Sequence, residues 1–257
     1  MAGLDHLFVG GHGEQVLAID LAFFEQLIPG AGTGAIRVRG LVNRFGSQTV
    51  HEGLDLDVRR GEILGVVGGS GTGKSVLMRS ILGLRVPDEG QIEVLGRDAR
   101  ADDAESRLHI ERNTGVLFQD GALFSSLTVG ENVQVPLKEH HPELPDSWRY
   151  ELALLKVKLA GLPADALNKL PSQLSGGQAQ RAALARAVLL RPKVILADEP
   201  TASLDDETCA HALALLRQTA DTLGATLVIA THDARVRHAL PQAQALVFDA
   251  LSLRSAA

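Results

Sequence analysis

A glycine-rich stretch that follows a short apolar run constrains this chain more than any other feature. The apolar run covers residues 63–67, and the pattern G-x-x-x-x-G-K-S follows it over residues 68–75. Because glycine lacks a Cβ, such a turn can wrap closely around an anion with its N–H groups pointing inward. A helix that begins at the lysine would direct the positive end of its dipole at the same anion. The sequence therefore predicts a strand, a phosphate-binding loop and a helix, in that order.

The residues of this loop have separate expected roles. Lys74 is expected to reach the outer phosphates of a nucleotide, and the Ser75 hydroxyl is expected to bind Mg²⁺. The remaining residues are expected to cradle the phosphates, and these are Gly68, Gly69, Ser70, Gly71, Thr72 and Gly73. The alternative is a glycine-rich turn with Lys-Ser by chance, which the preceding strand and following helix disfavour.

Composition excludes several classes of protein. The 257 residues carry a net charge of -6, which predicts no broad basic surface and no nucleic-acid partner. The single cysteine, Cys209, excludes an internal disulfide and a cysteine-cluster metal site, as is typical of a reducing compartment. No apolar run approaches the roughly 18–20 residues that span a bilayer, and no secretory signal pattern is present. We therefore expect a cytoplasmic protein whose membrane spans, if it needs any, belong to other chains.

The order of elements predicts an α/β fold with a mostly parallel sheet. Continuous apolar strands are expected over residues 193–197 and 225–230, separated by a helix over 206–223. Strands buried on both faces with helices between them are typical of parallel sheets. Alternating apolar and polar residues over 36–39, 50–58 and 91–95 predict half-exposed strands that precede or follow the loop.

Residues 120–170 differ in character from the rest of the chain. They contain several prolines, a polar turn at 140–142 and one expected helix over about 147–160. An alanine-rich helix is expected over about 178–190. We predict a helical subdomain over about residues 120–178, inserted in the sheet domain of residues 35–257.

Residues 1–34 are expected to form a flexible N-terminal extension. Leu17, Leu21, Phe24 and Ile28 recur at helical spacing, and a Pro- and Gly-rich linker over 29–34 follows them. The alternative is a helix that docks on a partner or a membrane surface. Deleting residues 1–34 is expected to leave nucleotide binding intact; loss of binding in a titration of the truncated chain would contradict this.

Further motifs lie at the ends of predicted strands, where parallel sheets place their ligands. After the phosphate loop come Gln119, the stretch 174–178 (Leu-Ser-Gly-Gly-Gln), Asp198-Glu199, the stretch 202–205 (Ala-Ser-Leu-Asp) and His232. This ordered set resembles the ATPase domain of ATP-binding-cassette (ABC) proteins, and the resemblance covers roughly residues 35–249. It implies a P-loop NTPase fold with a mostly parallel core sheet, an antiparallel β subdomain and a helical subdomain. It also implies ATP and Mg²⁺ as ligands.

The resemblance implies a role for each residue. Asp198 ends an apolar strand and is expected to hold Mg²⁺ together with Ser75 and Gln119. Glu199 would be the catalytic base, assisted by Gln119, Lys74 and His232, of which His232 would contact the γ-phosphate. Phe45 would stack on adenine, where the family more often has tyrosine.

The stretch 175–178 implies a second copy of the chain. In the family, Ser175, Gly176, Gly177 and Gln178 would cover the nucleotide held by the phosphate loop of another subunit. Two nucleotides would then be sandwiched head to tail between two subunits, with Asp205 at the interface. The family usually has Ser-Ala-Leu-Asp where this chain has Ala-Ser-Leu-Asp at 202–205, so a hydrogen bond from position 202 is in doubt.

Residues 115–140 carry a narrower resemblance. The pattern L-F-Q-x-G-A-L-F, with N-V and P-L-x-E-H further along, is similar to the ATPase of bacterial Mla-type phospholipid transport systems. It implies lipid transport, in particular of phospholipid, at the cytoplasmic face of the bacterial inner membrane. The implied partners are an integral-membrane permease, docked on the helical subdomain, and an MCE-type lipid-binding protein. The alternatives are a transporter ATPase for another substrate and, less well supported, a cassette ATPase that is not part of a transporter.

Overall fold

The computed structural model describes residues 34–100, 103–202, 204–239, 244–249 and 252–255. The chain divides into two units, Met1–Gly32 and Thr33–Ala257. The expectation for the N-terminal extension falls almost wholly on residues outside the described ranges. All the helices and strands described belong to the second unit.

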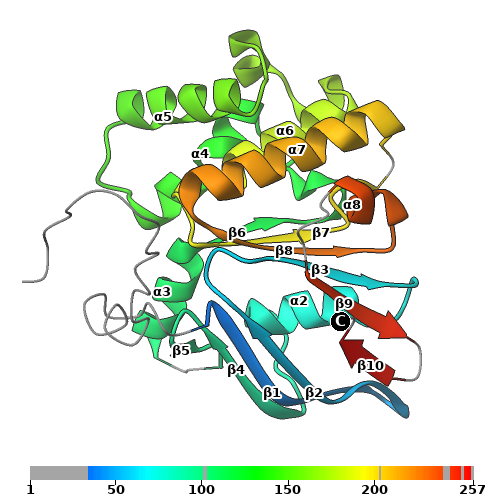
Figure 1. Ribbon diagram of the computed structural model, residues 1–257. Helices are drawn as coiled ribbons and strands as arrows, with labels where there is room; N and C mark the ends of the chain where they lie inside the picture. The colour runs from blue at the N-terminus through cyan, green and yellow to red at the C-terminus, as the bar shows by residue number, and fades with distance from the viewer. Residues whose placement is uncertain (1–33, 101–102, 203, 240–243, 250–251, 256–257) are drawn as a thin grey trace, which may run out of the picture. The chain divides into compact units, whose positions relative to one another are not determined.

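A six-stranded sheet forms the centre of this unit, in the order β10-β9-β3-β8-β7-β6 (Figure 1). The strands are β3 (Ile63–Gly68), β6 (Thr114–Leu117), β7 (Val194–Asp198), β8 (Thr226–Thr231), β9 (Gln244–Asp249) and β10 (Ser252–Ser255). All neighbouring strands are parallel except β9 and β10, which form an antiparallel pair. The prediction of a mostly parallel sheet is confirmed.

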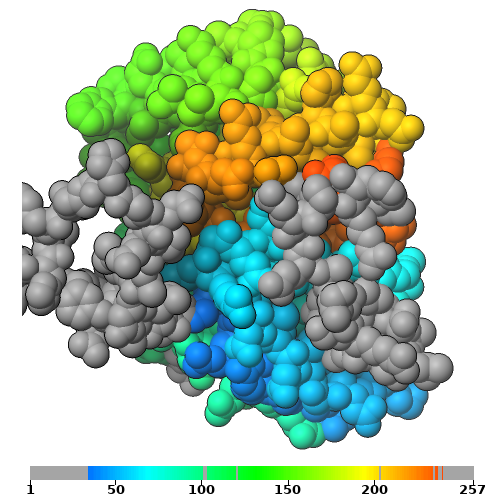
Figure 2. Space-filling model, in the orientation of Figure 1, coloured from blue at the N-terminus to red at the C-terminus, as the bar shows by residue number. Residues whose placement is uncertain are grey.

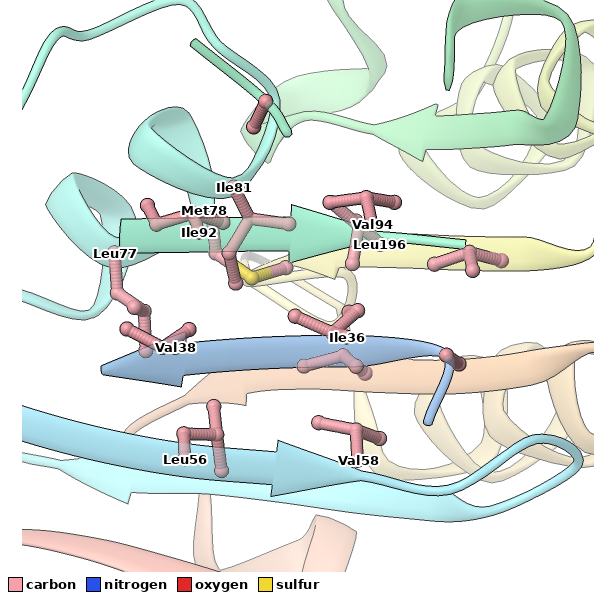
Figure 3. Close-up of a cluster of buried hydrophobic side chains, with 14 of the residues drawn as sticks. Ile36, Val38, Leu56, Val58, Leu77, Met78, Ile81, Ile92, Val94 and Leu196 are labelled. Atoms are coloured by element: carbon pink, nitrogen blue, oxygen red, sulfur yellow. The ribbon is translucent and has the colours of Figure 1, made fainter. Parts of the chain in front are cut away.

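A second, antiparallel sheet has the order β2-β1-β4-β5. Its strands are β1 (Ile36–Phe45), β2 (Gln48–Val58), β4 (Glu89–Val94) and β5 (Arg97–Asp98). Helix α2 (Lys74–Ile81) lies between the two sheets and buries its apolar side chains against both. Figure 3 shows Leu77, Met78 and Ile81 of this helix among side chains of the antiparallel sheet and Leu196 of β7. This packing fixes the phosphate loop, because the loop joins β3 to α2.

Two longer helices and one short helix cover the opposite face of the central sheet. They are α6 (Gly176–Ala187), α7 (Asp206–Leu223) and α8 (Ala234–Ala239). Leu213 and Leu216 of α7 are buried in one cluster with Ile195, Leu227 and Ile229 of the sheet. The central strands are therefore covered on both faces, which explains their continuous apolar sequences.

Helices α4 (Val129–His140) and α5 (Asp146–Leu159) pack with α6 around a third apolar cluster. Short 3₁₀ helices accompany them at Gln119–Ala122, Ala164–Asn168 and Pro171–Gln173. Figure 2 shows these helices, in green, gathered at one end of the unit and the antiparallel strands, in blue and cyan, at the other. Within the described residues, none of the helices has both the length and the apolar character that crossing a membrane requires.

Three helices were not predicted from the sequence, among them the short α8, and a further helix begins earlier than predicted. Helix α4 was not predicted because its Pro136 and the polar turn behind it suggested a break, yet the helix continues through the proline. Its start carries a signal: Thr128 and Glu131 form a reciprocal capping box. Helix α3 (Ala104–Asn113) was also missed, and α6 begins at Gly176 rather than near residue 178.

Candidate functional site

The phosphate loop joins β3 to α2 with a backbone that only glycine adopts easily. Gly71 and Gly73 have φ values of 79° and 101°, in the left-handed region. A Cβ on Gly73 would lie 2.5 Å from Val50 Cγ1 and 2.7 Å from His51 Nε2. The loop is therefore seated directly on β2, and position 73 excludes every other residue.

Lys74 occupies the interior of this loop. Its Nζ donates to the carbonyl oxygens of Gly68 and Gly69, at 2.9 and 2.8 Å, and lies 3.6 Å from Glu199 Oε1. The residue is only 5% exposed. A cation held among carbonyl groups at the first turn of a helix is well placed to exchange those contacts for phosphate oxygens.

Ser75 and Asp198 meet on the other side of the loop. The Ser75 hydroxyl donates to Asp198 Oδ1 at 3.0 Å, and burial raises the pKa of Asp198 above its ordinary value. Two converging hard oxygens suit Mg²⁺, which is usually bound through one or two protein oxygens, substrate phosphates and water. No group of three or more His, Cys, Asp or Glu side chains suited to a metal occurs in the described part of the chain. The residues present thus fit a cation that is bound mainly by a nucleotide.

Glu199 follows Asp198 in a strained backbone conformation. Its φ is 48°, which is uncommon for a residue other than glycine and is often found at active sites. The side chain is buried and accepts hydrogen bonds from Thr231 Oγ1 at 3.1 Å and from the His232 backbone N–H at 3.3 Å. His232 Nδ1 lies 2.8 Å from Glu199 Oε1, and the histidine ring remains mostly exposed. The structure thus places Lys74 and His232 near the same oxygen of one buried carboxylate, that of Glu199, and the catalytic roles of the three residues stay predictions.

Gln119 lies at the same edge of the sheet, but it is exposed. In the pairing of β6 with β7, Leu117 is opposite Ala197, so Gln119 and Glu199 each come two residues after this pair. The structure places Gln119 at the start of a 3₁₀ helix. Its predicted contact with Mg²⁺ stays a prediction.

The stretch 175–178 forms the N-terminus of α6. Ser175 Oγ accepts from the Gln178 backbone N–H, and Gln178 Oε1 accepts from the Ser175 N–H, so the two residues cap the helix reciprocally. A Cβ on Gly177 would lie 2.5 Å from Thr208 Cγ2 of α7. Thr208 is held in place by Asp205, which accepts hydrogen bonds from both the backbone and the hydroxyl of Thr208. The start of α6 thus packs against the start of α7.

Gly177→Ala is expected to destabilise the protein by about 1–3 kcal/mol, as overpacking of a close contact does. Relieving the clash would require rotating Thr208 away from Asp205, which breaks the hydrogen bond of 2.8 Å from its hydroxyl. Thermal unfolding measures the effect. Gly176→Ala is the matched control, because its Cβ would meet Leu204 at an ordinary 3.8 Å. Adding Thr208→Ser, which removes the offending methyl, should restore the melting temperature; no restoration would contradict the explanation.

A polar network that was not predicted from the sequence involves Asp233 and Arg235, which follow His232 in the chain. The Thr201 hydroxyl donates to Asp233, and the Arg235 guanidinium donates to Asp233, to Asp206 and to the Leu204 carbonyl oxygen. Hydrogen bonds from Arg235 lower the pKa of Asp233 to about 2. The contacts link residues 201–206 to residues 233–235, which no sequence pattern indicated.

Phe45 ends β1 and is 46% exposed. The Arg85 guanidinium lies over its ring, 3.9 Å from the centroid. An exposed aromatic ring on β1, the strand paired with β2, is compatible with the predicted adenine stacking, which stays a prediction.

A comparison with protein families matches residues 51–202 to the family model described as ABC transporter. The chain is 38% identical, over 83% of its length, to the probable ribonucleotide transport ATP-binding protein mkl of Mycobacterium leprae. It is 41% identical, over 80% of its length, to the methionine import ATP-binding protein MetN of Rhizobium johnstonii. The chain spans 61% and 56% of the lengths of these two relatives.

Solved structures agree with the sequence comparisons. The ATP-binding cassette MJ0796, solved as a dimer in a post-hydrolysis state with ADP and phosphate, has a TM-score of 0.77 and 30% identity. That match covers 86% of this chain and 98% of the solved one. The structure of cbiO1 from Clostridium perfringens, part of the ABC transporter complex cbiONQ, gives a TM-score of 0.75 with 26% identity. From its fold, its phosphate loop and these relatives, the chain belongs to the ABC transporter family and carries the ATPase domain of that family.

Proposed function

We propose that this chain binds and hydrolyses ATP as the energising subunit of a membrane transporter. The observation that carries the proposal is the convergence of Lys74, Asp198, Glu199 and His232 at one edge of the central sheet. An amine, a carboxylate in contact with a serine hydroxyl and a buried carboxylate beside a histidine are the groups that phosphoryl transfer from a nucleotide requires.

The geometry suggests how these groups divide the work. Lys74 would neutralise charge on the outer phosphates, while Glu199 would orient and deprotonate the attacking water. His232 holds the Glu199 carboxylate through Nδ1 at 2.8 Å, and its exposed ring is free to meet the γ-phosphate. When bound, Mg²⁺ would neutralise charge on the phosphates next to Ser75 and Asp198.

We further propose that two copies work as a nucleotide-sandwich dimer. Ser175 caps the N-terminus of α6. The backbone N–H groups there would bind the γ-phosphate of a nucleotide held by the phosphate loop of the other copy. Contacts to a γ-phosphate would close the dimer when ATP is bound, and their loss after hydrolysis would open it. The dimeric solved structures of MJ0796 support this arrangement.

A groove beside α4 supports a permease as a partner. It lies among α3, β6, α4 and α6, and its lining includes Phe118, Phe124, Pro136, Glu111 and Glu139. Phe124 is 53% exposed, which is high for a large apolar side chain. An apolar groove with acidic residues at its rim suits an amphipathic helix with basic flanks.

For the substrate we propose a lipid, and in particular a phospholipid, with an MCE-type protein as a further partner. The support is the sequence pattern of residues 115–140, which resembles Mla-type ATPases. The relatives found by comparison are named for ribonucleotide transport and methionine import, so transport of another small molecule is the second candidate. The cytoplasmic face of the bacterial inner membrane is the proposed location.

Affinity purification of the tagged chain from detergent-solubilised native membranes tests the proposal. A permease, an MCE protein and co-purifying phospholipid, identified by mass spectrometry, are expected. Phe124→Asp should lose the permease, while Trp148→Asp on α5, also an exposed aromatic at 63%, should keep it. Recovery of a permease without an MCE protein or lipid would overturn the lipid assignment. Failure to recover any permease would overturn the proposal that the chain is a transporter subunit.

A further inference from the structure

Arg85 lies in the turn between α2 and β4, and its half-buried side chain makes several contacts with the end of β1. Its guanidinium covers one face of the Phe45 ring at 3.9 Å. Its Nη2 donates to the Arg44 carbonyl oxygen at 2.8 Å, and its Nε donates to Asn43 Oδ1 at 2.9 Å. The side chain is thus held at three points along the end of β1.

The contact with Asn43 fixes the orientation of a buried amide. Asn43 is fully buried, and because its Oδ1 accepts from Arg85, its Nδ2 must be the atom that donates. Nδ2 lies 3.0 Å from His51 Nδ1 and donates to Ser80 Oγ at 3.3 Å. His51 Nδ1 therefore acts as an acceptor, and the ring proton is on Nε2.

His51 brings this chain of contacts to the phosphate loop. Its Nε2 is the atom that a Cβ on Gly73 would approach to 2.7 Å. Burial lowers the pKa of His51 to about 4, and a hydrogen bond with the Gly73 backbone opposes this effect more weakly. The ring is therefore neutral at pH 7 and supports the loop from below without adding a charge.

We propose that Arg85 is a positioning residue for the nucleotide: it holds Phe45 as a platform for the base. Support of the phosphate loop comes from Asn43 through His51, and Asn43 has contacts with His51 and Ser80 that do not involve Arg85. The inference rests on the proposed function, because it assumes that a base stacks on Phe45. Phe45 is 46% exposed although Arg85 covers one face of its ring, so part of its surface is open to a base. A phenylalanine has no hydroxyl to fix its ring, and the guanidinium supplies that restraint by a cation–π contact.

The two ends of the network can be separated by comparing two ligands in the presence of Mg²⁺. ATP engages both the base platform and the phosphate loop, whereas inorganic tripolyphosphate engages the loop alone. Arg85→Ala is expected to weaken ATP binding about three- to tenfold and to change tripolyphosphate binding less than twofold. Turnover at saturating ATP should be unchanged, so the loss appears in KM rather than kcat. Asn43→Ala, which cuts the connection to His51, is expected to weaken both ligands.

Controls distinguish this inference from the proposal on which it rests. Arg97→Ala is the matched control, because Arg97 is an exposed arginine of the same sheet that pairs with Glu105. Phe45→Ala should weaken ATP binding about 5- to 100-fold, as the loss of base stacking does. If Phe45→Ala has no effect, the base is not bound there and that part of the proposed function is wrong. If Phe45→Ala weakens ATP but Arg85→Ala matches Arg97→Ala, or weakens both ligands equally, Arg85 does not position the platform.

Discussion

Glu199→Gln is expected to keep ATP binding and to slow hydrolysis by about two to four orders of magnitude, the range for losing a general base. The amide has nearly the same shape, so it can still accept hydrogen bonds from Thr231 and from the His232 backbone. It cannot take a proton from the attacking water. Because Lys74 and the phosphate loop are untouched, the affinity for nucleotide should change little.

Two measurements on the same preparation check this expectation. Phosphate release reports hydrolysis, and titration with a fluorescent ATP analogue reports binding. Glu151→Gln is the matched control, because Glu151 is an exposed carboxylate on α5. Turnover near the wild-type rate in Glu199→Gln would refute the assignment of Glu199 as the base.

Lys74→Ala is expected to act at the earlier step, by weakening nucleotide binding about 10- to 150-fold. The substitution removes a cation that would bind phosphate oxygens, and it leaves the loop carbonyls of Gly68 and Gly69 without their donor. It also removes the positive charge 3.6 Å from Glu199, a buried carboxylate. We therefore expect some loss of stability as well as of affinity.

The same fluorescent titration measures the loss, and thermal unfolding without nucleotide separates stability from binding. Lys158→Ala, at an exposed lysine of α5, is the control for a lost surface charge. Wild-type affinity in Lys74→Ala would mean that the phosphates are bound elsewhere. The two variants together separate binding from chemistry, since Lys74→Ala is expected to lower affinity, whereas Glu199→Gln is expected to lower turnover at nearly unchanged affinity.

Local sequence determined the phosphate loop, because its glycines encode a backbone that other residues cannot adopt. Local sequence also placed Asp198 and Glu199 at the end of a strand, because a continuous apolar run precedes them. Such apolar runs in turn predict a parallel sheet. Local sequence could also have revealed α4, because the capping box of Thr128 and Glu131 marks its start. The proline at position 136 obscured that signal, because proline usually ends a helix. The helix forms nonetheless, since its packing against α5 and α6 outweighs the cost of one proline.

The contacts between distant segments were decided only by the tertiary structure. Arg85 over Phe45, His51 beneath Gly73 and Thr208 against Gly177 each join residues at least 22 positions apart in the chain. Their residue types carry no pattern of their own: an arginine in a turn or a histidine in a strand is usually exposed or merely packed. The groups proposed to bind phosphate could be predicted from the sequence, because they lie in one loop and at a few strand ends. How those groups are held in place depends on which strands and helices pack together, and only the folded chain decides that.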